Sequence, residues 1–400
     1  MTAHSLYLHI PFCTHRCAYC DFNTYADQEM LIPAYVDALC REVEIVAGSA
    51  PETLEIHTIY FGGGTPSLLA AELIGRILHR VRSNFRVDPA AEVSLEANPG
   101  TVSEASLTGY RDYGITRLSL GVQSANTEEL RLLERSHDFV SVIDAVAAAR
   151  KAAFRNLSVD LIFGLPGQSL STWGSTVRRA LDLGPEHISA YGLTLEHGTP
   201  FAAWAARGLL PIVDPDLAAD MYELASEAFV SAGFHQYEIS NWAFPDMEYR
   251  HNMQYWRGLP YLGLGAGAHG YAGGVRTVNA LRIATYVERM AESDWPFTAR
   301  PFPWTPATVS RKRILTGDEM SETMMMGLRL TEEGVSSRTF LERFGLGLPE
   351  MYAREIDLLV GQGLVEWCKK TPGEGDSPDV LRLTRRGRLL GNQVFMQFLS

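Results

Sequence analysis

Three cysteines near the N-terminus, Cys13, Cys17 and Cys20, have the type and spacing needed to bind one metal centre. Thiolates are soft ligands that suit zinc or an iron–sulfur cluster. A [4Fe–4S] cluster held by three cysteines keeps one iron without a protein ligand, and that iron can bind a substrate or cofactor. The alternative is a structural zinc site, with His9 or His15 as fourth ligand. Spacing favours the open cluster and leaves zinc as the alternative.

A glycine-rich segment follows a predicted strand close to these cysteines. The run Tyr-Leu-His-Ile-Pro-Phe at 7–12 predicts a short strand that leads into the cysteine loop. A second predicted strand, His57–Phe61, runs into Gly-Gly-Gly-Thr-Pro at 62–66. Glycines at such a position let the backbone approach a ligand and present N–H groups to a carboxylate or phosphate. The pattern therefore predicts a ligand site beside the metal centre.

Strand-like and helix-like segments alternate over the first half of the chain. Candidate helices include Pro33–Ala47, Ser103–Tyr113 with Ser103 as N-cap, Val140–Ala153 and Leu170–Leu183. The six candidate strands are Leu6–Ile10, His57–Phe61, Glu92–Glu96, Arg117–Gly121, Leu157–Phe163 and His187–Leu193. Such repeats predict an α/β fold with parallel strands and right-handed crossovers. Six units rather than eight predict a partial, open (β/α)6 barrel.

Polar residues stand at the predicted ends of three strands. They are Glu96, Gln123 and Asp160, and Arg135 lies one helix further along the chain. The carboxyl ends of parallel strands meet at one rim, where functional groups gather in barrels of this kind. We therefore expect these side chains to share one site.

Together these residues resemble the radical S-adenosylmethionine (SAM) enzymes. The hallmark of that family is C-x3-C-x2-C with an aromatic residue before the third cysteine, here Tyr19, and a glycine-rich segment after the second strand. The resemblance implies a [4Fe–4S] cluster on Cys13, Cys17 and Cys20, whose fourth iron is chelated by SAM. In that family the reduced cluster cleaves SAM to a 5′-deoxyadenosyl radical, and the protein positions these cofactors. Carried over by motif, the residues expected to contact SAM are Tyr7, Tyr19, Gly63, Gly64, Thr65, Glu96, Gln123, Arg135 and Asp160.

Composition narrows the class of protein. The chain has 400 residues, 46% of them hydrophobic, which is enough for two or more domains with a sizeable core. A formal net charge of −12 argues against a protein that relies on broad attraction to nucleic acid or acidic membranes. Five cysteines, three of them clustered, do not form a disulfide pattern, and thiols that hold iron must stay reduced, so we expect a cytoplasmic protein. We also expect no secretory leader and no membrane-spanning segment.

The second half of the chain is less regular. We expect residues 1–200 to form the barrel with the cluster and SAM site, residues 201–300 to extend it, and residues 301–400 to form a C-terminal domain. The glycine-rich segment Leu262–Gly270 lacks the strand–helix context of a dinucleotide motif. Short helices followed by a hairpin across Thr371–Asp379 resemble a small winged-helix domain. A packing and partner-contact role is favoured over DNA binding through Arg385, Arg386 and Arg388, because acidic and basic residues are mixed throughout.

Over nearly its whole length the sequence resembles the family of oxygen-independent coproporphyrinogen III oxidase, which includes haem chaperones of the HemW type. The motifs that carry the resemblance are Tyr-Leu-His-Ile-Pro-Phe-Cys, Gly-Gly-Gly-Thr-Pro-Ser, Leu-Gly-Val-Gln-Ser and Asp-Leu-Ile-Phe-Gly-Leu-Pro-Gly-Gln. The oxidases have a further cysteine where this chain has Phe22, and an N-terminal extension where it has only Met1 to Leu6. The run His251-Asn252-Met253-Gln254-Tyr255-Trp256 fits the H-N-x-x-Y-W signature of the chaperone branch. The resemblance thus implies a haem chaperone and puts porphyrinogen decarboxylation in doubt.

The same run has side chains suited to haem. A histidine can ligate haem iron axially, and flat aromatic rings can pack on a porphyrin face. The alternative is a histidine that is hydrogen-bonded within an aromatic core. With the family signature, the expected haem-site residues are His251, Asn252, Tyr255 and Trp256.

The leading hypothesis is a haem chaperone that binds haem and delivers it to haem-requiring, respiratory proteins. Its expected partners are haem, the acceptor proteins and a reductant protein such as a flavodoxin or ferredoxin, with no nucleic acid. A monomer or homodimer is expected, with peripheral membrane association if the acceptors are in a membrane. The alternatives are an oxygen-independent coproporphyrinogen III oxidase and a radical-SAM haem-degrading enzyme.

Overall fold

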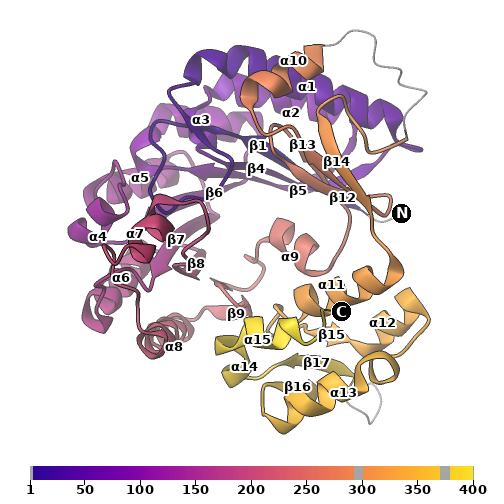
Figure 1. Cartoon of the computed structure of the whole chain (residues 1–400). Helices are drawn as coiled ribbons and strands as arrows, with labels where there is room; N and C mark the ends of the chain where they lie inside the picture. Colours follow the sequence, from indigo (N-terminus) through magenta and orange to yellow (C-terminus); the bar gives the residue numbers. More distant parts are fainter. Residues whose placement is uncertain (1–2, 292–300, 370–378, 400) are drawn as a thin grey trace. The chain divides into compact units, whose positions relative to one another are not determined.

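The structure of the chain, a computed structural model, describes residues 3–291, 301–369 and 379–399 (Figure 1). These residues belong to two compact units. Unit 1 comprises residues 1–233 and 260–312, and unit 2 comprises residues 234–259 and 313–400. The chain therefore crosses between the units three times.

The centre of unit 1 is a parallel sheet whose strands coincide with the six predicted segments. In chain order they are β1 (His4–Ile10), β4 (Glu55–Gly63), β5 (Arg86–Ala97), β6 (Arg117–Gln123), β7 (Leu157–Phe163) and β8 (His187–Gly192). Each strand pairs in parallel with the next, so order in space follows order in sequence. The predicted α/β fold with parallel strands is confirmed.

The sheet of unit 1 continues beyond β1 with four short strands that the sequence pattern does not reveal. They are β11 (Tyr261–Leu264), β12 (His269–Ala272), β13 (Val275–Asn279) and β14 (Thr308–Arg313). β11 pairs in parallel with β1, and β12 and β13 follow as antiparallel strands. Their lengths of four to six residues are too short for a clear periodicity.

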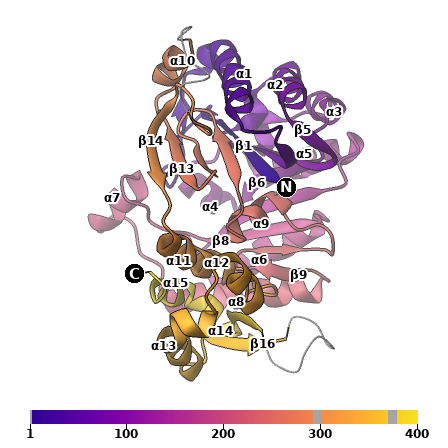
Figure 2. The ribbon, with the colours of Figure 1, turned by 90° about the vertical axis from the view of Figure 1, so that its right-hand side faces the viewer.

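Helices form a row along one side of this sheet (Figures 1 and 2). Within the row, α1 (Ile32–Ser49), α2 (Ala71–Asn84), α3 (Glu104–Tyr113) and α5 (Phe139–Lys151) each pack on the next. As predicted, the Ser103 side chain caps α3, by accepting a hydrogen bond from Ser106 N–H. The remaining helices of unit 1 are α4 (Thr127–Leu132), α6 (Leu170–Asp182), α7 (Pro200–Ala206), α8 (Pro215–Ser231) and α10 (Ile283–Ala291).

The two faces of the parallel sheet differ in chemistry. Side chains alternate along a strand, so the buried Leu6, Leu8 and Ile10 of β1 share one face, and Tyr7 and His9 point to the other. The strand register carries this second face across the sheet as a polar layer. Its members include Thr58, Tyr60, Ser94, Glu96, Arg117, Ser119, Ser158, Asp160, His187 and Ser189. The sheet therefore presents a polar inner face to any ligand at its rim.

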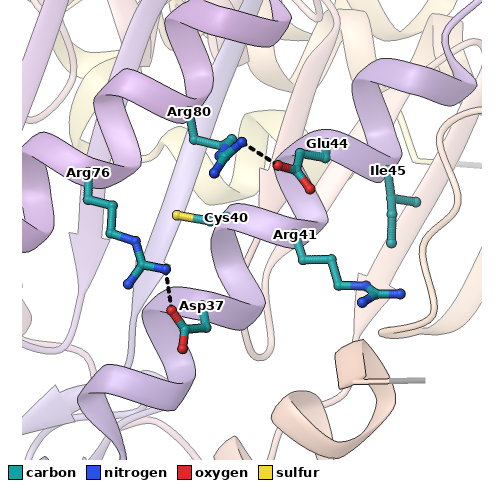
Figure 3. A pocket seen from close by; sticks show the side chains of 7 residues that line it. All are labelled: Asp37, Cys40, Arg41, Glu44, Ile45, Arg76 and Arg80. Carbon is teal, nitrogen blue, oxygen red and sulfur yellow. Dashed lines mark hydrogen bonds and ion pairs between the residues drawn. The ribbon is translucent and has the colours of Figure 1, made fainter. Parts of the chain in front are cut away.

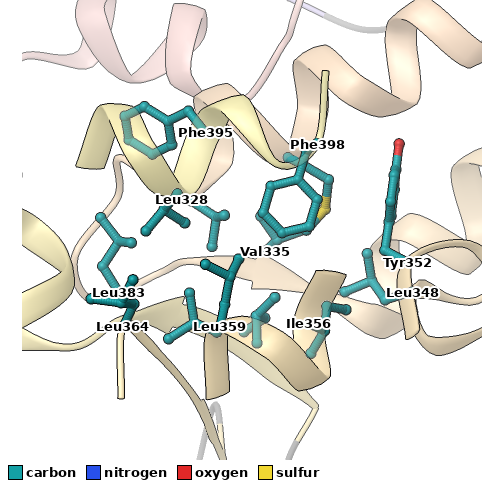
Figure 4. Close-up of a cluster of buried hydrophobic side chains, with 14 of the residues drawn as sticks. Leu328, Val335, Leu348, Tyr352, Ile356, Leu359, Leu364, Leu383, Phe395 and Phe398 are labelled. Carbon is teal, nitrogen blue, oxygen red and sulfur yellow. The ribbon is translucent and has the colours of Figure 1, made fainter. Parts of the chain in front are cut away.

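Unit 2 is built around its own hydrophobic core (Figure 4). Leu328, Leu348, Leu381 and Val394 are fully buried there. The strands are the antiparallel pair β9 (His235–Glu238) and β10 (Asn241–Ala243), and a second sheet in the order β15 (Val335–Ser336), β17 (Val380–Leu383), β16 (Val365–Cys368). The helices are α9 (Arg250–Trp256), α11 (Thr316–Gly327), α12 (Ser337–Phe344), α13 (Leu348–Gly361), α14 (Arg385–Leu389) and α15 (Gly391–Met396). The expected hairpin is the β16–β17 pair, while residues 371–378 of its loop lie outside the described residues.

The division of the chain differs from the expected split at residues 200 and 300. Residues 234–259, which carry α9, group with the C-terminal residues, because α9 packs on α11 and Glu238 bridges to Leu330. Residues 260–312 group with the barrel instead, because β11 pairs with β1. Long-range pairing thus decides the division of residues 201–300.

The basic residues considered for DNA binding are engaged within unit 2. Arg386 donates to the Gln362 carbonyl at 3.3 Å, and Arg388 donates to the Gln236 side-chain oxygen at 2.7 Å. The nucleic-acid hypothesis therefore gains no support from these side chains. Over the described ranges, every helix is too short or too polar to traverse a lipid bilayer.

Candidate functional site

The three clustered cysteines lie in the loop that follows β1. Cys13 ends β2 (Phe12–Cys13), which pairs with β3 (Tyr25–Ala26), and the loop between them carries Cys17 and Cys20. The Cys20 N–H donates to the Cys17 carbonyl at 3.1 Å. Burial raises the pKa of the Cys13 thiol, and the nearby Cys20 and Cys17 thiols raise it further. Cys17 and Cys20 therefore lie close enough to Cys13 for their charges to act on its thiol.

The glycine segment at the end of β4 closes over this loop. Gly63 has φ +117°, a backbone conformation that favours glycine. A Cβ on Gly64 would stand 2.6 Å from the Phe12 carbonyl oxygen and 3.0 Å from Cys13 Sγ. The next residue, Thr65, donates its hydroxyl to Cys13 Sγ at 3.6 Å. Glycine is required at position 64 because the backbone there approaches the Cys13 sulfur and the Phe12 carbonyl so closely.

Neither histidine considered for a zinc site is placed as a fourth ligand. His9 Nε2 lies 2.9 Å from the Asn23 carbonyl oxygen and must donate to it, so Nδ1 accepts from the Tyr7 hydroxyl at 3.0 Å. His15 is exposed and pairs with Glu134 at 3.2 Å. Throughout residues 3–291, 301–369 and 379–399, no three His, Cys, Asp or Glu side chains converge as they would on a single ion. In a [4Fe–4S] cluster each cysteine binds a different iron, so its ligands are more widely spaced than those of a single metal ion. The three neighbouring thiols and the close glycine backbone at 63–64 fit such a cluster.

The predicted Glu96 lies beside the glycine segment on the inner face of the sheet. Its carboxylate accepts hydrogen bonds from the Tyr60 hydroxyl at 2.7 Å and from the Gly63 N–H at 3.1 Å. Burial raises the pKa of Glu96 to about 7, and the Asp160 carboxylate adds to this rise. Tyr7 stacks on Tyr60 with ring centroids 6.1 Å apart. Both predicted residues, Glu96 and Tyr7, thus reach the same rim.

Arg135 contacts both the end of β6 and the loop between β2 and β3 that carries the cysteines, which we call the cluster loop. Its guanidinium donates to the Gly121 carbonyl at 3.0 Å and lies 3.8 Å from Cys17 Sγ. It also hydrogen-bonds Tyr19, whose pKa is raised by burial. Gln123, at the end of β6, has φ +65° and would crowd a side chain at Gly121. The cationic Arg135 is therefore suited to balance the negative charge of thiolate ligands.

A short helix that the sequence analysis does not assign to the site packs on the cluster loop. The Phe201 N–H of α7 donates to the Ala18 carbonyl at 3.1 Å, between Cys17 and Cys20. The fully buried Phe201 ring lies 6.3 Å from the Tyr19 ring, centroid to centroid. Leu133, Ile162 and Leu165 complete this hydrophobic cluster. The only sequence signal is the aromatic Phe201, which could equally have belonged to a core.

Asn23 is a second contributor that sequence reasoning misses. Its amide donates to the Ala266 and Leu281 carbonyls, both at 3.0 Å, and its Oδ1 accepts from the Tyr25 hydroxyl at 3.0 Å. Its backbone carbonyl receives the His9 Nε2 hydrogen bond. One side chain therefore ties the cluster loop to two distant segments of unit 1.

These contacts explain the glycine-rich segment at 262–270. Gly267 has φ +75°, and a Cβ there would stand 2.4 Å from Asn23 Nδ2. Gly265 has φ +102°, and a Cβ there would stand 2.6 Å from the His9 carbonyl and from the Tyr35 hydroxyl. The segment is a close-packed support for β1 and the cluster loop.

Replacing Asn23 with alanine should therefore reduce cluster loading while leaving the barrel folded. Three side-chain hydrogen bonds are lost, which costs the loop roughly 1–3 kcal/mol. Iron and sulfide per chain after anaerobic reconstitution measure the effect. Asn84→Ala is the matched control, because Asn84 donates only locally, to the Arg80 carbonyl at 2.9 Å. Full loading of Asn23→Ala would contradict the role given to this side chain.

The residues predicted for haem lie in unit 2, on and beside α9. His251 is 1% exposed, and its Nε2 lies 2.8 Å from the Tyr255 hydroxyl, with the rings edge to face. Trp256 lies beneath the Arg329 guanidinium, 4.5 Å from the ring centroid. Asn252 is half-buried. The histidine is thus held in the hydrogen-bonded, aromatic setting that the sequence analysis weighed as the alternative to a haem ligand.

A cavity between α1 and α2 contains none of the predicted residues (Figure 3). It is bordered by ion pairs of Arg76 with Asp37 and of Arg80 with Glu44, on either side of Cys40. Burial raises the pKa of the Cys40 thiol. This thiol belongs to the helix row and not to the cluster loop.

Comparison with known protein families gives two matches along the chain. The Radical SAM superfamily matches residues 7–180, and the HemN C-terminal domain matches residues 317–390. The first range contains every residue predicted for the cluster and SAM. Neither range includes α9.

Relatives and solved structures match over greater lengths. "Heme chaperone HemW" of Bacillus subtilis is 36% identical over 400 residues, which cover 99% of both chains. The protein of the same name from Mycobacterium tuberculosis is 37% identical over 402 residues, 99% of this chain and 94% of that one. Coproporphyrinogen III oxidase (HemN) from Escherichia coli superposes with a TM-score of 0.80 at 24% identity, over 99% of this chain and 90% of that one. At that identity the solved structure supports the fold alone.

Proposed function

The chain belongs to the HemW family of radical SAM proteins, and from this premise we propose that it binds haem and delivers it to haem-requiring proteins. The observation that carries the proposal is the sequence similarity to proteins named as haem chaperones. The aligned region covers 99% of this chain and therefore includes both units and α9. Respiratory enzymes are the proposed acceptors. The setting is proposed to be cytoplasmic, because the clustered thiols must stay reduced.

In unit 1 we propose that Cys13, Cys17 and Cys20 hold a [4Fe–4S] cluster and that the inner rim binds SAM. When bound, these two groups supply one-electron chemistry, with electrons from a reductant protein such as a flavodoxin or ferredoxin. Thr65 donates a hydrogen bond to Cys13 Sγ, and Arg135 supplies positive charge beside Cys17. Glu96 and Asp160 are the acceptors available to the cationic groups of SAM.

Porphyrinogen decarboxylation is the weaker proposal for this chain. Phe22 stands where the oxidases carry their further cysteine, and its side chain is 62% exposed. An exposed phenyl ring supplies neither a thiol nor an acid–base group. We therefore propose that the rim of unit 1 binds SAM but does not support decarboxylation of a porphyrinogen.

In unit 2 we propose His251 as the haem ligand, released by movement of Tyr255. The Nε2 atom that would bind iron is engaged with the Tyr255 hydroxyl at 2.8 Å. Ligation through Nε2 requires that this contact break, since in either tautomer the Tyr255 hydroxyl occupies the position that the iron would take. This movement leaves the contact between the Trp256 ring and the Arg329 guanidinium in place.

Anaerobic titration of the cluster-reconstituted protein with haem, followed by transfer to an apo-acceptor, tests the proposal. Saturable binding with a shifted Soret band, then restored acceptor activity, is the expected result. Binding without delivery would refute the chaperone function. Formation of protoporphyrinogen from coproporphyrinogen with SAM and reductant would replace it with the oxidase function.

Tyr255→Phe should strengthen haem binding. Removing the hydroxyl releases His251 Nε2 at the cost of one hydrogen bond, a change of about 1 kcal/mol or about fivefold in apparent Kd. The Soret titration measures it, with Tyr249→Phe in the same unit as control. Weaker binding by Tyr255→Phe would instead identify Tyr255 oxygen as the iron ligand.

A further inference from the structure

A glutamate side chain is fully enclosed in unit 1, on the first long helix. Glu42 of α1 is 0% exposed, and α1 packs against α10, which lies beside it in both views of the chain (Figures 1 and 2). Glu42 belongs to none of the motifs that predict the cluster or the SAM site. Burying a carboxylate is costly unless its oxygens accept hydrogen bonds, so its partners indicate what it holds in place.

Four donors converge on the two oxygens of this carboxylate. Oε2 accepts from the Gly265 N–H at 2.8 Å and from the Tyr286 hydroxyl at 2.7 Å. Oε1 accepts from the Asn279 side-chain amide at 2.7 Å and from the Thr305 hydroxyl at 2.9 Å. Burial raises the pKa of Glu42, and all four donors act against that rise. Two donors on each oxygen use the full capacity of an ionised carboxylate.

All four donors come from residues 260–312, which we call the returning segment because the chain re-enters unit 1 there after leaving it at residue 233. The donors lie just after β11, at the end of β13, in α10 and shortly before β14. Glu42 therefore connects four separate parts of the returning segment to one helix of the barrel.

The returning segment also supports the cluster loop. Asn23 of that loop donates to the Ala266 and Leu281 carbonyls, both at 3.0 Å. Ala266 follows directly on Gly265, and Leu281 stands two residues after Asn279. The buried carboxylate and the Asn23 amide thus hold neighbouring residues at the same two places, the ends of β11 and β13.

Tyr35, two turns before Glu42 on α1, makes a second connection between the same parts. Its hydroxyl accepts from the Ala266 N–H at 2.9 Å and donates to the His9 carbonyl at 2.7 Å. The His9 ring in turn donates to the Asn23 carbonyl at 2.9 Å. The end of β11 is therefore held by α1 on one side and contacts β1 and the cluster loop on the other.

We propose that Glu42 is a positioning residue for the [4Fe–4S] cluster. By fixing the ends of β11 and β13, it holds the two carbonyls to which Asn23 donates, and so keeps the cluster loop in the conformation in which its three cysteines share one cluster. The proposal rests on the function assigned above, in which that loop binds the cluster. Loss of the carboxylate loosens the loop although every cysteine is still present.

Glu42→Gln tests this role at nearly constant shape. An amide has an NH2 group in place of one oxygen, so it cannot accept from both the Gly265 and the Asn279 N–H groups, and one of these hydrogen bonds is lost. The cluster-reconstituted variant should release iron to the chelator bathophenanthroline about tenfold faster than wild type does. The electron paramagnetic resonance signal of its reduced cluster should also change shape.

Glu44→Gln is the matched control for the same chemical change. Glu44 lies on the same helix but pairs with Arg80 near the surface, at 2.6 Å. Its variant should release iron at the wild-type rate and keep the wild-type signal. Tyr286→Phe removes one of the four donors and keeps the ring, so it should release iron about threefold faster.

Combining Glu42→Gln with Asn23→Ala separates positioning from general damage to unit 1. In the Asn23→Ala chain, Glu42→Gln should change the rate of iron release by less than about twofold, because the contact that it supports is already absent. A full additional effect there would overturn the proposal, as would wild-type release and signal in Glu42→Gln alone.

Should Glu42→Gln fail to fold, Tyr286→Phe decides in its place, and a wild-type rate of iron release in that variant would overturn the proposal. Failure of the wild-type chain to bind a cluster would instead refute the proposed cluster site. The two failures are therefore distinguishable.

Discussion

Cys17→Ala is expected to lose nearly all of its iron and sulfide after anaerobic reconstitution, together with the brown absorbance of the cluster. The reason is the ligand count, because only three thiols gather in the loop and each is needed for one iron. Arg135, which lies 3.8 Å from Cys17 Sγ, would then face no thiolate. Iron and sulfide assays and electron paramagnetic resonance of the reduced protein measure the loss.

The other two cysteines provide matched controls. Cys40 lies in α1 with 4% exposure, between two ion pairs (Figure 3), and Cys368 lies in β16 of unit 2. Cys40→Ala and Cys368→Ala should load as much iron as wild type. If Cys17→Ala kept a full cluster, the ligand assignment would be wrong.

His251→Ala is expected to raise the apparent Kd for haem by about tenfold or more, since an axial bond contributes at least roughly 1.4 kcal/mol. The Soret shift should be lost or altered with it. His251→Gln is the better-folded companion, because it keeps a polar group beside Tyr255 but supplies no imidazole. Visible titration under anaerobic conditions gives both quantities.

His235→Ala controls for loss of a histidine from the same unit. His235 pairs with Glu248 at 2.8 Å on the β9 strand and has no assigned part in haem binding. It should bind haem as wild type does. Equal binding by His251→Ala and His235→Ala would keep haem binding but remove His251 as its ligand.

Much of unit 1 could be predicted from local pattern. The strands at His57–Phe61 and Leu157–Phe163 are bounded by glycine or polar turns, and Ser103 has the hydrogen-bonding side chain that starts a helix. Rim residues such as Glu96 could be predicted because parallel strands end at one edge. In these segments the local sequence pattern and the order of the strands lead to the same prediction.

The remainder depends on contacts between residues far apart in sequence. Asn23 meets Ala266 and Leu281 across more than two hundred residues, and nothing near Asn23 signals this. The Arg117–Glu92 pair reads in sequence as two ordinary charges, because burial on the inner face follows from strand register. The motif contains the His251–Tyr255 contact, but it does not encode the packing of α9 on α11.

The interleaved course of the chain has a consequence for biosynthesis. Residues 234–259 are translated before residues 260–312, which complete the sheet of unit 1, and well before α11 of unit 2. During translation, α9 is therefore synthesised before α11, the helix on which it packs, and before the last strands of the unit 1 sheet. Until α11 has been translated, His251 and Tyr255 lack the helix on which α9 packs in the complete unit 2. Haem that met the chain at this stage would find the motif before the fold that encloses it.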